Sequence, residues 1–462
     1  MQDIEGKRKF GFSIYIIAVI AALGGLLFGL DQGIISGALP FIKNTFKIGT
    51  TVQEVVVSSL MLGCVCGVIA IRPVSQKFGR KKALIISGTL FVLASISSGL
   101  SVHVYMLIVS RFFIGISVGI ASFVTPIYIA EIAPRQIRGG MIALFQFLIV
   151  LGIALAFLVD SALTPFGAWR YMLGSISIPG IVMLIGLFFL PESPRWLMLY
   201  GRRDESEQIL KKLDRTDEEV EFEIKEISKS VHEKQSSWEF LKNSNYRRVL
   251  YLGIGLQLFQ QLCGWVALIY YAPSIFSEMG FKTPESRIWV AFFVCGVFHV
   301  LATILPVFLN DRWGRKKLLY IGVTLNIISM IMIAILFFIG IDVAVWVKYI
   351  AVTLLLLFNI GYSISLGPVV WTLCSEIFPL KGRDLGMMTA TAANWIGSFF
   401  VAQLTLTIMQ FFGPGLTFIM FAVIGVLTII FTYLYVPETK GVPLEEIEEA
   451  LLSGKKLRDI GL

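Results

Sequence analysis

Charged residues are scarce in this sequence, and their scarcity excludes a soluble protein. Asp, Glu, Lys and Arg make up 15% of the 462 residues, whereas 56% are hydrophobic. Because soluble domains carry about 25% charged residues, the composition predicts an integral membrane protein. The alternation typical of a transmembrane β-barrel is also missing, so we expect the spanning elements to be α-helices.

Histidine and cysteine are rare as well. The three histidines are His103, His232 and His299; they form no nucleophile–base pair, and no phosphate-binding loop is present, so we expect neither an enzyme nor a bound cofactor. The five cysteines all fall in apolar segments, without a disulfide framework or the further ligands that a metal site needs. Missing Asn-x-Ser/Thr acceptors and a missing organelle leader favour the inner membrane of a bacterium.

The hydrophobic residues gather into twelve apolar segments, each long enough to cross a bilayer as a helix. We place them at residues 10–39, 52–71, 83–102, 104–128, 139–160, 171–190, 249–276, 288–309, 318–340, 346–371, 385–411 and 414–436. The first segment is too long for the core of a signal peptide. The sequence therefore predicts twelve transmembrane helices.

The distribution of basic residues predicts the orientation. When both termini and the connections after even-numbered segments are assigned to one side, that side holds 32 of the 39 Lys and Arg residues and the other side holds six. Arg111 alone lies within the membrane. By the positive-inside rule both termini are cytoplasmic. The net charge of +8 therefore reflects topology, and nothing supports a nucleic-acid partner.

Three sequence motifs occur twice, each time at the cytoplasmic ends of corresponding helices. Residues 75–88 match 310–323, residues 131–139 match 376–384, and PESPRW at 191–196 matches PETKG at 437–441. Both copies keep the same orientation. Parallel halves of this kind build the major facilitator architecture, so the sequence predicts an all-α membrane protein with two six-helix halves.

A change of composition separates the halves. Residues 1–191 form the first half and 249–436 the second, and residues 192–248 between them are rich in charge. The apolar residues of this linker recur at helical spacing, which predicts amphipathic cytoplasmic helices. The same pattern is present in the tail, residues 437–462.

Uncharged polar residues within apolar segments predict a binding face. Gln257, Gln260 and Gln261 share one helical face of the seventh segment, where unbonded amides would be costly. A face of neutral donors and acceptors suits a hydroxyl-rich ligand. Amides that bond neighbouring helices together are the alternative. Further candidates are Gln146 in the fifth segment, Trp371 after a helix break expected at Gly367-Pro368, and the Asn394-Trp395 pair.

Asp31 is an ionisable residue among the glycines and aliphatic residues of the first segment. Such residues in a membrane are functional candidates, and we expect Asp31 to bind and release a proton. Arg111 is its one membrane-embedded partner candidate; pairing with it opposes protonation, so the pair would have to loosen. The alternatives are a carboxylate at the outer helix end and a static ion pair.

Charged residues at the cytoplasmic helix ends form a second group of candidate functional residues: Arg80, Glu131, Arg138, Arg315, Glu376 and Arg383. Ion pairs across the two halves would close the inner mouth, and breaking them would open it. The alternative is a set of surface ion pairs and membrane-insertion signals.

The motifs GLLFGLDQG, RKK after Phe78-Gly79, SEIFPLKGRD, PESPRW and PETKG resemble the sugar porter family of the major facilitator superfamily. The stretch from Gly367 to Gly461 is most similar to bacterial galactose and arabinose proton symporters. The resemblance implies proton-coupled uptake of a hexose or pentose by alternating access, with Asp31 as proton acceptor and Arg111 as its modulator. It places the sugar on Gln146, Gln260, Gln261, Trp371 and Asn394, with Phe28 and Trp395 nearby, and it implies inner-gate networks among the six charged residues above.

Three positions depart from the family pattern. Val266 and His299 stand where the family usually has sugar-binding Asn residues, and Gln76 stands where it has an Asp at one gate. A lost sugar-facing amide leaves a hydroxyl unpaired, at a cost of about 1–3 kcal/mol. His299 can both donate and accept, so it is a candidate substitute.

The function predicted from the sequence is a proton-driven monosaccharide symporter in the plasma membrane, working as a monomer. A passive sugar facilitator is the nearest alternative in mechanism, and a carrier of another neutral polyol is the nearest in substrate. A sugar sensor is disfavoured because the tail after the last segment, residues 437–462, is short.

Overall fold

The computed structural model describes residues 12–134, 137–213, 217–232, 241–341, 343–379, 382–442 and 444–460. Its first half contains seven α-helices: α1 (Phe12–Phe46), α2 (Thr50–Phe78), α3 (Arg80–Gly99), α4 (Val104–Ile132), α5 (Arg138–Leu163), α6 (Trp169–Ser175) and α7 (Ser177–Phe189). A short 3-10 helix, Thr164–Phe166, lies between α5 and α6. Helices α6 and α7 together cover the predicted sixth segment.

The second half repeats this plan with more interruptions. Its helices are α11 (Ser244–Leu262), α12 (Trp265–Glu278), α13 (Pro284–Ala291), a π-helix (Phe292–Val297), α14 (Phe298–Ala302), α15 (Leu305–Trp313), α16 (Arg315–Ile339), α17 (Val345–Ile364), α18 (Leu366–Ile377) and α19 (Arg383–Tyr435). The linker forms α8 (Pro194–Leu199), α9 (Arg203–Lys212) and α10 (Asp217–His232). The tail contains α20 (Leu444–Leu452) and a 3-10 turn, Leu457–Asp459.

All twelve predicted segments are helical over most of their described residues. The described residues contain 11 stretches long and apolar enough to cross a membrane, and the last of them, Leu385–Tyr435, covers two predicted segments. Its chain turns at Gly413, where φ is 79°, before Pro414. The predicted seventh segment is two helices, since Gly264 has a φ of 99° between α11 and α12. The tenth is also two, broken at Ser365 shortly before Gly367-Pro368.

Helices within each half pack closely because glycines face one another. An added Cβ on Gly63 of α2 would lie 3.0 Å from the Cα of Gly115 in α4. An added Cβ on Gly152 of α5 would lie 3.0 Å from the Cα of Gly29 in α1. Small residues of this kind let helix backbones approach in a membrane, where burial away from water gives no preference for one apolar neighbour over another.

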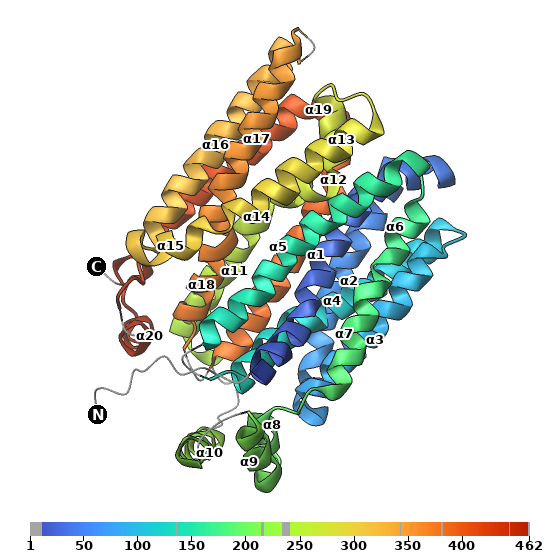
Figure 1. Cartoon of the computed structure of the whole chain (residues 1–462). Coiled ribbons are helices and arrows are strands. Elements are labelled where there is room, and N and C mark those ends of the chain that lie inside the picture. The colour runs from blue at the N-terminus through green and yellow to red at the C-terminus, as the bar shows by residue number, and fades with distance from the viewer. Residues whose placement is uncertain are drawn as a thin grey trace.

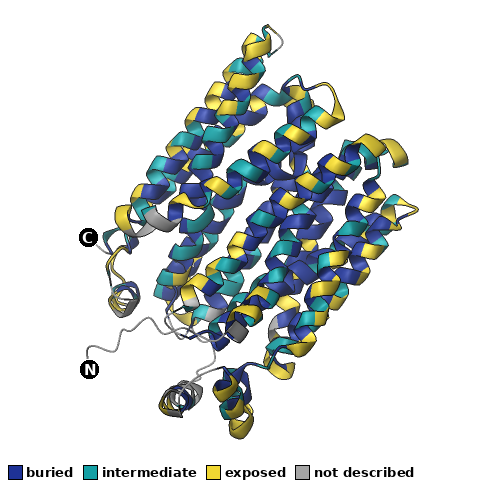
Figure 2. Cartoon of the chain, in the orientation of Figure 1, coloured by how far each residue is buried: buried dark blue, intermediate teal, exposed yellow. Residues whose placement is uncertain are grey.

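The molecule has two distinct ends (Figure 1). The start of α1, the linker helices α8–α10 and α20 lie at one end, which we call the terminal end; the opposite end, with the start of α2 and the Gly413 turn, is the distal end. The halves meet where α2 contacts α19, α1 contacts α12, and α5 contacts α13 and α14. Exposed residues follow the outer faces of the helices (Figure 2), and many are large and apolar, including Leu93, Phe189 and Tyr433. Hydrocarbon is a suitable solvent for such a surface.

Candidate functional site

Four amide side chains from two helices meet between α11 and α19. Asn394 Nδ2 donates to Gln257 Oε1 at 2.6 Å and to Gln260 Oε1 at 2.8 Å. Gln261 Nε2 reaches Gln260 Oε1 at 3.3 Å, and its own oxygen accepts from Ser398 Oγ at 3.0 Å. All four amides are buried. The shared helical face predicted for the three glutamines is therefore present, and Asn394 joins it from a different helix.

The broken tenth segment contributes backbone acceptors to the same amide cluster. Gln260 Nε2 donates to the carbonyls of Leu366 at 2.8 Å and Gly367 at 3.0 Å. Leu366 and Gly367 are the first two residues of α18, and a backbone carbonyl has a second lone pair that can accept from a side chain. The helix break is present at Ser365, and the expectation that it frees carbonyls stays a prediction. The amides bond neighbouring helices together, as the alternative interpretation proposed, while they present the groups that a hydroxyl-rich ligand needs.

Aromatic rings lie beside the amides. Phe28 of α1 contacts Trp395 of α19 edge to face, with ring centroids 5.2 Å apart, so this contact crosses between the halves. Trp395 is buried, and its Nε1 has no hydrogen-bond partner among the described residues. Trp371 is half-buried on α18. Gln146 is exposed on α5, and no hydrogen bond among the described residues joins it to the amide cluster.

His299 sits in a polar network of its own in the second half. Its Nδ1 lies 2.9 Å from Asn359 Oδ1 and 3.2 Å from Ser363 Oγ, and Asn359 Nδ2 donates to the Val294 carbonyl of the π-helix at 2.8 Å. Because Asn359 uses its nitrogen as a donor there, its oxygen is the acceptor, and His299 carries its proton on Nδ1. Sequence reasoning missed Asn359, although a single amide in the apolar run LLLLFNIGY was a signal.

Trp265 fills the space beside His299. Its ring stacks on Tyr362 with centroids 4.7 Å apart, and its centroid lies 4.3 Å from that of His299. Val266, the next residue, is buried in the first turn of α12. The two departures from the family pattern therefore adjoin a compact aromatic cluster.

Asp31 and Arg111 form a fully buried ion pair. Arg111 Nη1 and Nη2 lie 3.0 and 3.2 Å from the two Asp31 carboxylate oxygens, and both side chains are 0% exposed. Arg111 Nε also donates to the Val56 carbonyl of α2 at 2.8 Å. Three helices thus meet at this pair. The alternative of a carboxylate at the outer surface is wrong, because no part of Asp31 is exposed.

The charged residues of the terminal end form two matching networks, one in each half. Arg80 is bidentate on Glu131, with Nε and Nη2 both at 3.0 Å, and Ser193 Oγ donates to Glu131. In the second half Arg315 pairs with Glu376 at 2.8 Å, and Thr439 Oγ donates to Glu376.

The predicted ion pairs across the halves are not formed in this conformation, as far as the described residues go. Arg80 and Arg315 each pair within their own half. Arg383 Nε donates to the Phe378 carbonyl of its own half at 3.3 Å. The side chain of Arg138 lies outside the described residues. Each of the two acids, Glu131 and Glu376, is thus paired with a base of its own half.

Two glutamates of the PESPRW and PETKG motifs were not singled out from sequence. Glu192 Oε1 accepts from the backbone N–H groups of Arg80 and Lys81, and Glu438 does the same for Arg315 and Lys316. Each carboxylate thus caps the N-terminus of α3 or α16, where the helix dipole favours negative charge. The duplicated motifs therefore form the same helix-capping device twice.

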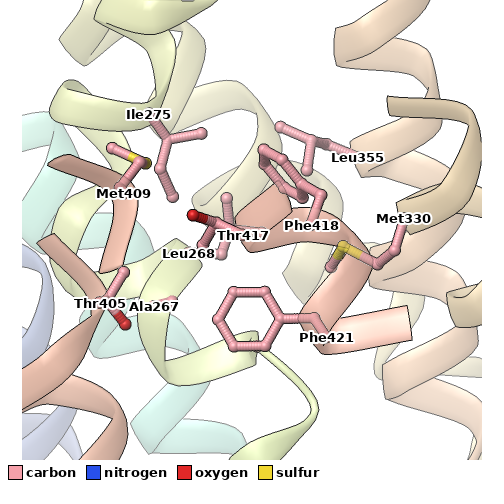
Figure 3. Close-up of a pocket in the computed structure, with 11 residues that line it drawn as sticks. Ala267, Leu268, Ile275, Met330, Leu355, Thr405, Met409, Thr417, Phe418 and Phe421 are labelled. Atoms are coloured by element: carbon pink, nitrogen blue, oxygen red, sulfur yellow. The ribbon is translucent and has the colours of Figure 1, made fainter. Parts of the chain in front are cut away.

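One further pocket lies among α12, α16, α17 and α19 in the second half (Figure 3). Aromatic, aliphatic and methionine side chains line it, and its two threonines, Thr405 and Thr417, donate to carbonyls of α19 itself. With no free polar group among these side chains, the pocket does not suit a sugar.

Comparison with known proteins identifies the family. The family model described as "Sugar (and other) transporter" matches residues 17–451, which is most of the chain. The chain belongs to this family of transporters. It is 45% identical to the galactose-proton symporter of Escherichia coli K12, over 97% of this chain and 96% of the relative. It is 41% identical to the arabinose-proton symporter of the same strain, over 96% and 95%.

A solved structure supports the same assignment. The xylose transporter XylE from E. coli, in a partially occluded inward open conformation, superposes with a TM-score of 0.82 at 29% identity, over 93% of this chain and 99% of XylE. The fold is therefore that of the major facilitator superfamily, as the repeated motifs predicted. The protein is a multi-pass membrane transporter and not an enzyme.

Proposed function

We propose that this protein is a proton-coupled monosaccharide symporter that imports a hexose or pentose by alternating access. Relatives 45% and 41% identical over nearly the whole chain are named galactose- and arabinose-proton symporters. The observation that carries the proposal is the fully buried pair of Asp31 and Arg111 in one half, opposite a cluster of neutral amides in the other. A group that can take a proton and a surface that can take hydroxyls thus belong to separate halves.

Proton binding acts on the contact between α1 and α4. The Asp31 carboxylate is held by two N–H groups of Arg111, and a proton on Asp31 removes the charge that these groups bind. Arg111 stays anchored to the Val56 carbonyl of α2, so α1 is the element released. Protonation then favours the outward-open, sugar-binding state, and loss of the proton inside restores the pair.

Sugar binding exchanges bonds within the amide cluster. Gln257, Gln260 and Asn394 now use their donors and acceptors on one another and on two carbonyls. Sugar hydroxyls both donate and accept, so they replace amide–amide bonds one for one. The faces of Trp371 and Trp395 supply flat apolar surface for the sugar ring. Phe28 contacts Trp395 from the first half, and Gln146 and Gln261 complete the set of sugar contacts.

Val266 and His299 select the sugar. Val266 offers no hydrogen bond where an Asn would, so a sugar with a hydroxyl at that place is disfavoured. His299 uses Nδ1 on Asn359, which leaves Nε2 as an acceptor. Selection among hexoses and pentoses therefore depends on which hydroxyl meets these two positions.

The protein sits in the bacterial inner membrane as a monomer, with the terminal end and both termini in the cytoplasm. The excess of Lys and Arg on that side supports this orientation. In this orientation Arg80, Glu131, Arg138, Arg315, Glu376 and Arg383 surround the inner mouth and serve as its gate. Residues 1–191 and 249–436 act as the two moving halves, and residues 192–248 and 437–462 lie beneath them.

The test is uptake of a panel of labelled sugars into proteoliposomes, with and without an inward proton gradient. Accumulation above equilibrium that collapses with an uncoupler is the expected result, and the panel names the sugar. Equilibration that ignores the gradient would make the protein a passive facilitator, with Asp31 a structural charge. If no sugar moves and a sugar alcohol does, the substrate is another neutral polyol. If sugars bind without moving, the protein is a sensor.

A further inference from the structure

A row of polar side chains joins the two halves at the distal end. Three residues on one face of α2 pair in antiparallel order with three residues of α19. Thr50 Oγ1 donates to Gln410 Oε1 at 2.7 Å, and Ser58 Oγ donates to Gln403 Oε1 at 2.6 Å. Between these two bonds, the backbone N and Oγ1 of Thr407 donate to the Glu54 carboxylate at 2.7 and 2.5 Å. We call these six residues the distal seam.

Glu54 is the unusual member of the distal seam. It is 1% exposed, and both of its oxygens accept from Thr407, one from the backbone N–H and one from the hydroxyl. No salt bridge of the described residues includes Glu54. A carboxyl group in such a place is costly unless its oxygens are bonded. On α12, the Tyr271 hydroxyl interacts electrostatically with Glu54 and donates to the Ala402 carbonyl of α19.

The bonds of Glu54 exist only while the halves touch at the distal end. Glu54 belongs to α2 of the first half and Thr407 to α19 of the second, so separating the halves breaks both bonds together. An interaction made in one conformation and absent from the other shifts the balance between them. At the terminal end the ion pairs of Arg80 and Arg315 lie within their own halves in this structure, so separating the halves does not by itself break them. The distal seam is therefore present only in the conformation in which the two halves are in contact at the distal end of the molecule.

We propose that Glu54 is a positioning residue for transport, which holds the distal seam closed in the inward-facing state through Thr407. The proposal rests on the proposed function, in which the distal end faces outside. Resemblance to the inward open conformation of XylE supports the assignment of the state. Sugar can then enter from outside only after Thr407 leaves Glu54, which makes the seam an outer gate.

The test measures the distance across the seam by spin labels on cysteines placed at Thr51 and Phe412, in a chain whose five native cysteines are replaced. Both positions are exposed, Thr51 near the start of α2 and Phe412 beside the Gly413 turn of α19. The parent should show a predominant short distance. Glu54→Ala removes both bonds and should lower the ratio of closed to open molecules by roughly tenfold or more. Thr407→Val removes only the hydroxyl and should lower the ratio by a smaller factor.

Matched variants distinguish a specific effect of Glu54 on the distal seam from a nonspecific loss of packing at the distal end. Glu278→Ala removes an exposed acid near the same end of α12 and should leave the distances at their parental values. Glu54→Gln retains an oxygen that accepts the Thr407 N–H, so it should recover part of the closed population. Unchanged distances in both Glu54→Ala and Thr407→Val would overturn the proposal, as would an equal response to Glu278→Ala.

Transport supplies an independent measurement in the same membranes. With the outer gate loosened, the external sugar concentration at half-maximal uptake should fall and the internal one should rise, since more molecules face outward. The distance measurement needs no sugar, so the two proposals can fail separately. A seam that opens in Glu54→Ala while the parent moves no sugar supports the role of Glu54 and refutes symport. If the parent accumulates sugar while the spin-label distances in Glu54→Ala equal those of the parent, symport is supported and the role of Glu54 is refuted.

Discussion

Replacing Asp31 with Asn separates proton coupling from sugar binding, because the ion pair and the amide cluster lie in different halves. In the parent, two N–H groups of Arg111 meet two carboxylate oxygens, and neither side chain is exposed. Asn offers one acceptor oxygen, so one N–H loses its partner and the guanidinium loses its counter-charge. Breaking a buried pair from one side costs about 3–5 kcal/mol. Asp31→Asn should therefore unfold at a lower temperature than the parent.

The same variant should lose concentrative uptake and retain exchange. In proteoliposomes with an inward proton gradient, the accumulation ratio of Asp31→Asn should fall to about one. Counterflow of labelled sugar, which needs no net proton movement, should stay within roughly tenfold of the parent because the amide cluster is intact. Full accumulation by Asp31→Asn would refute the reasoning outright.

Two control variants make this result specific. Asp31→Asn combined with Arg111→Gln leaves no unpaired charge, so stability should recover while accumulation stays lost. Asp160 is an equally buried acid on α5, with no hydrogen-bond partner for either oxygen among the described residues. Asp160→Asn should leave accumulation unchanged, because Asp160 has no cationic partner among the described residues whose release could drive a conformational step.

Three further predictions follow from single contacts. Gln260→Ala removes the amide that bonds two carbonyls and Asn394, and it should raise the half-saturating sugar concentration by about tenfold or more; an unchanged value would exclude it from the site. Gly79→Ala places a side chain at a φ of 99° against Glu192 and should destabilise the protein by about 1–3 kcal/mol in thermal unfolding, whereas Gly139→Ala, with open space around it, should be neutral. His299→Asn introduces the amide usual in the family and should change the order of preference in the sugar panel; an identical order would place His299 outside the selective surface.

The helices and the halves could be predicted from sequence because both depend on local or repeated patterns. Hydrocarbon requires an apolar run for every crossing, so the segments were recognisable one at a time. The same constraint explains why the boundaries were less accurate. Helix α1 continues to Phe46 and α2 to Phe78, beyond the apolar runs, since helical hydrogen bonding persists where the surroundings become polar.

The sequence predicted which residues belong to the candidate site better than it predicted their hydrogen-bond partners. Asp31 with Arg111 could be paired because each is an isolated charge in an apolar segment. Asn359 was overlooked as the partner of His299, since the two lie 60 residues apart and only the packing of α14 on α17 joins them. The hydrogen bonds of Gln260 to backbone carbonyls depend on where the tenth segment breaks, which its sequence indicated only within a few residues.

The class of protein, the parallel halves and the polar residues within the membrane were readable from composition and repetition, because a lipid surrounding constrains both. The contacts between distant helices were not readable in this way and required the folded structure. Glu54 and Thr407 are 353 residues apart, and no local pattern links them. Their contact depends on how α2 and α19 pack against each other, which the sequence near either residue does not specify.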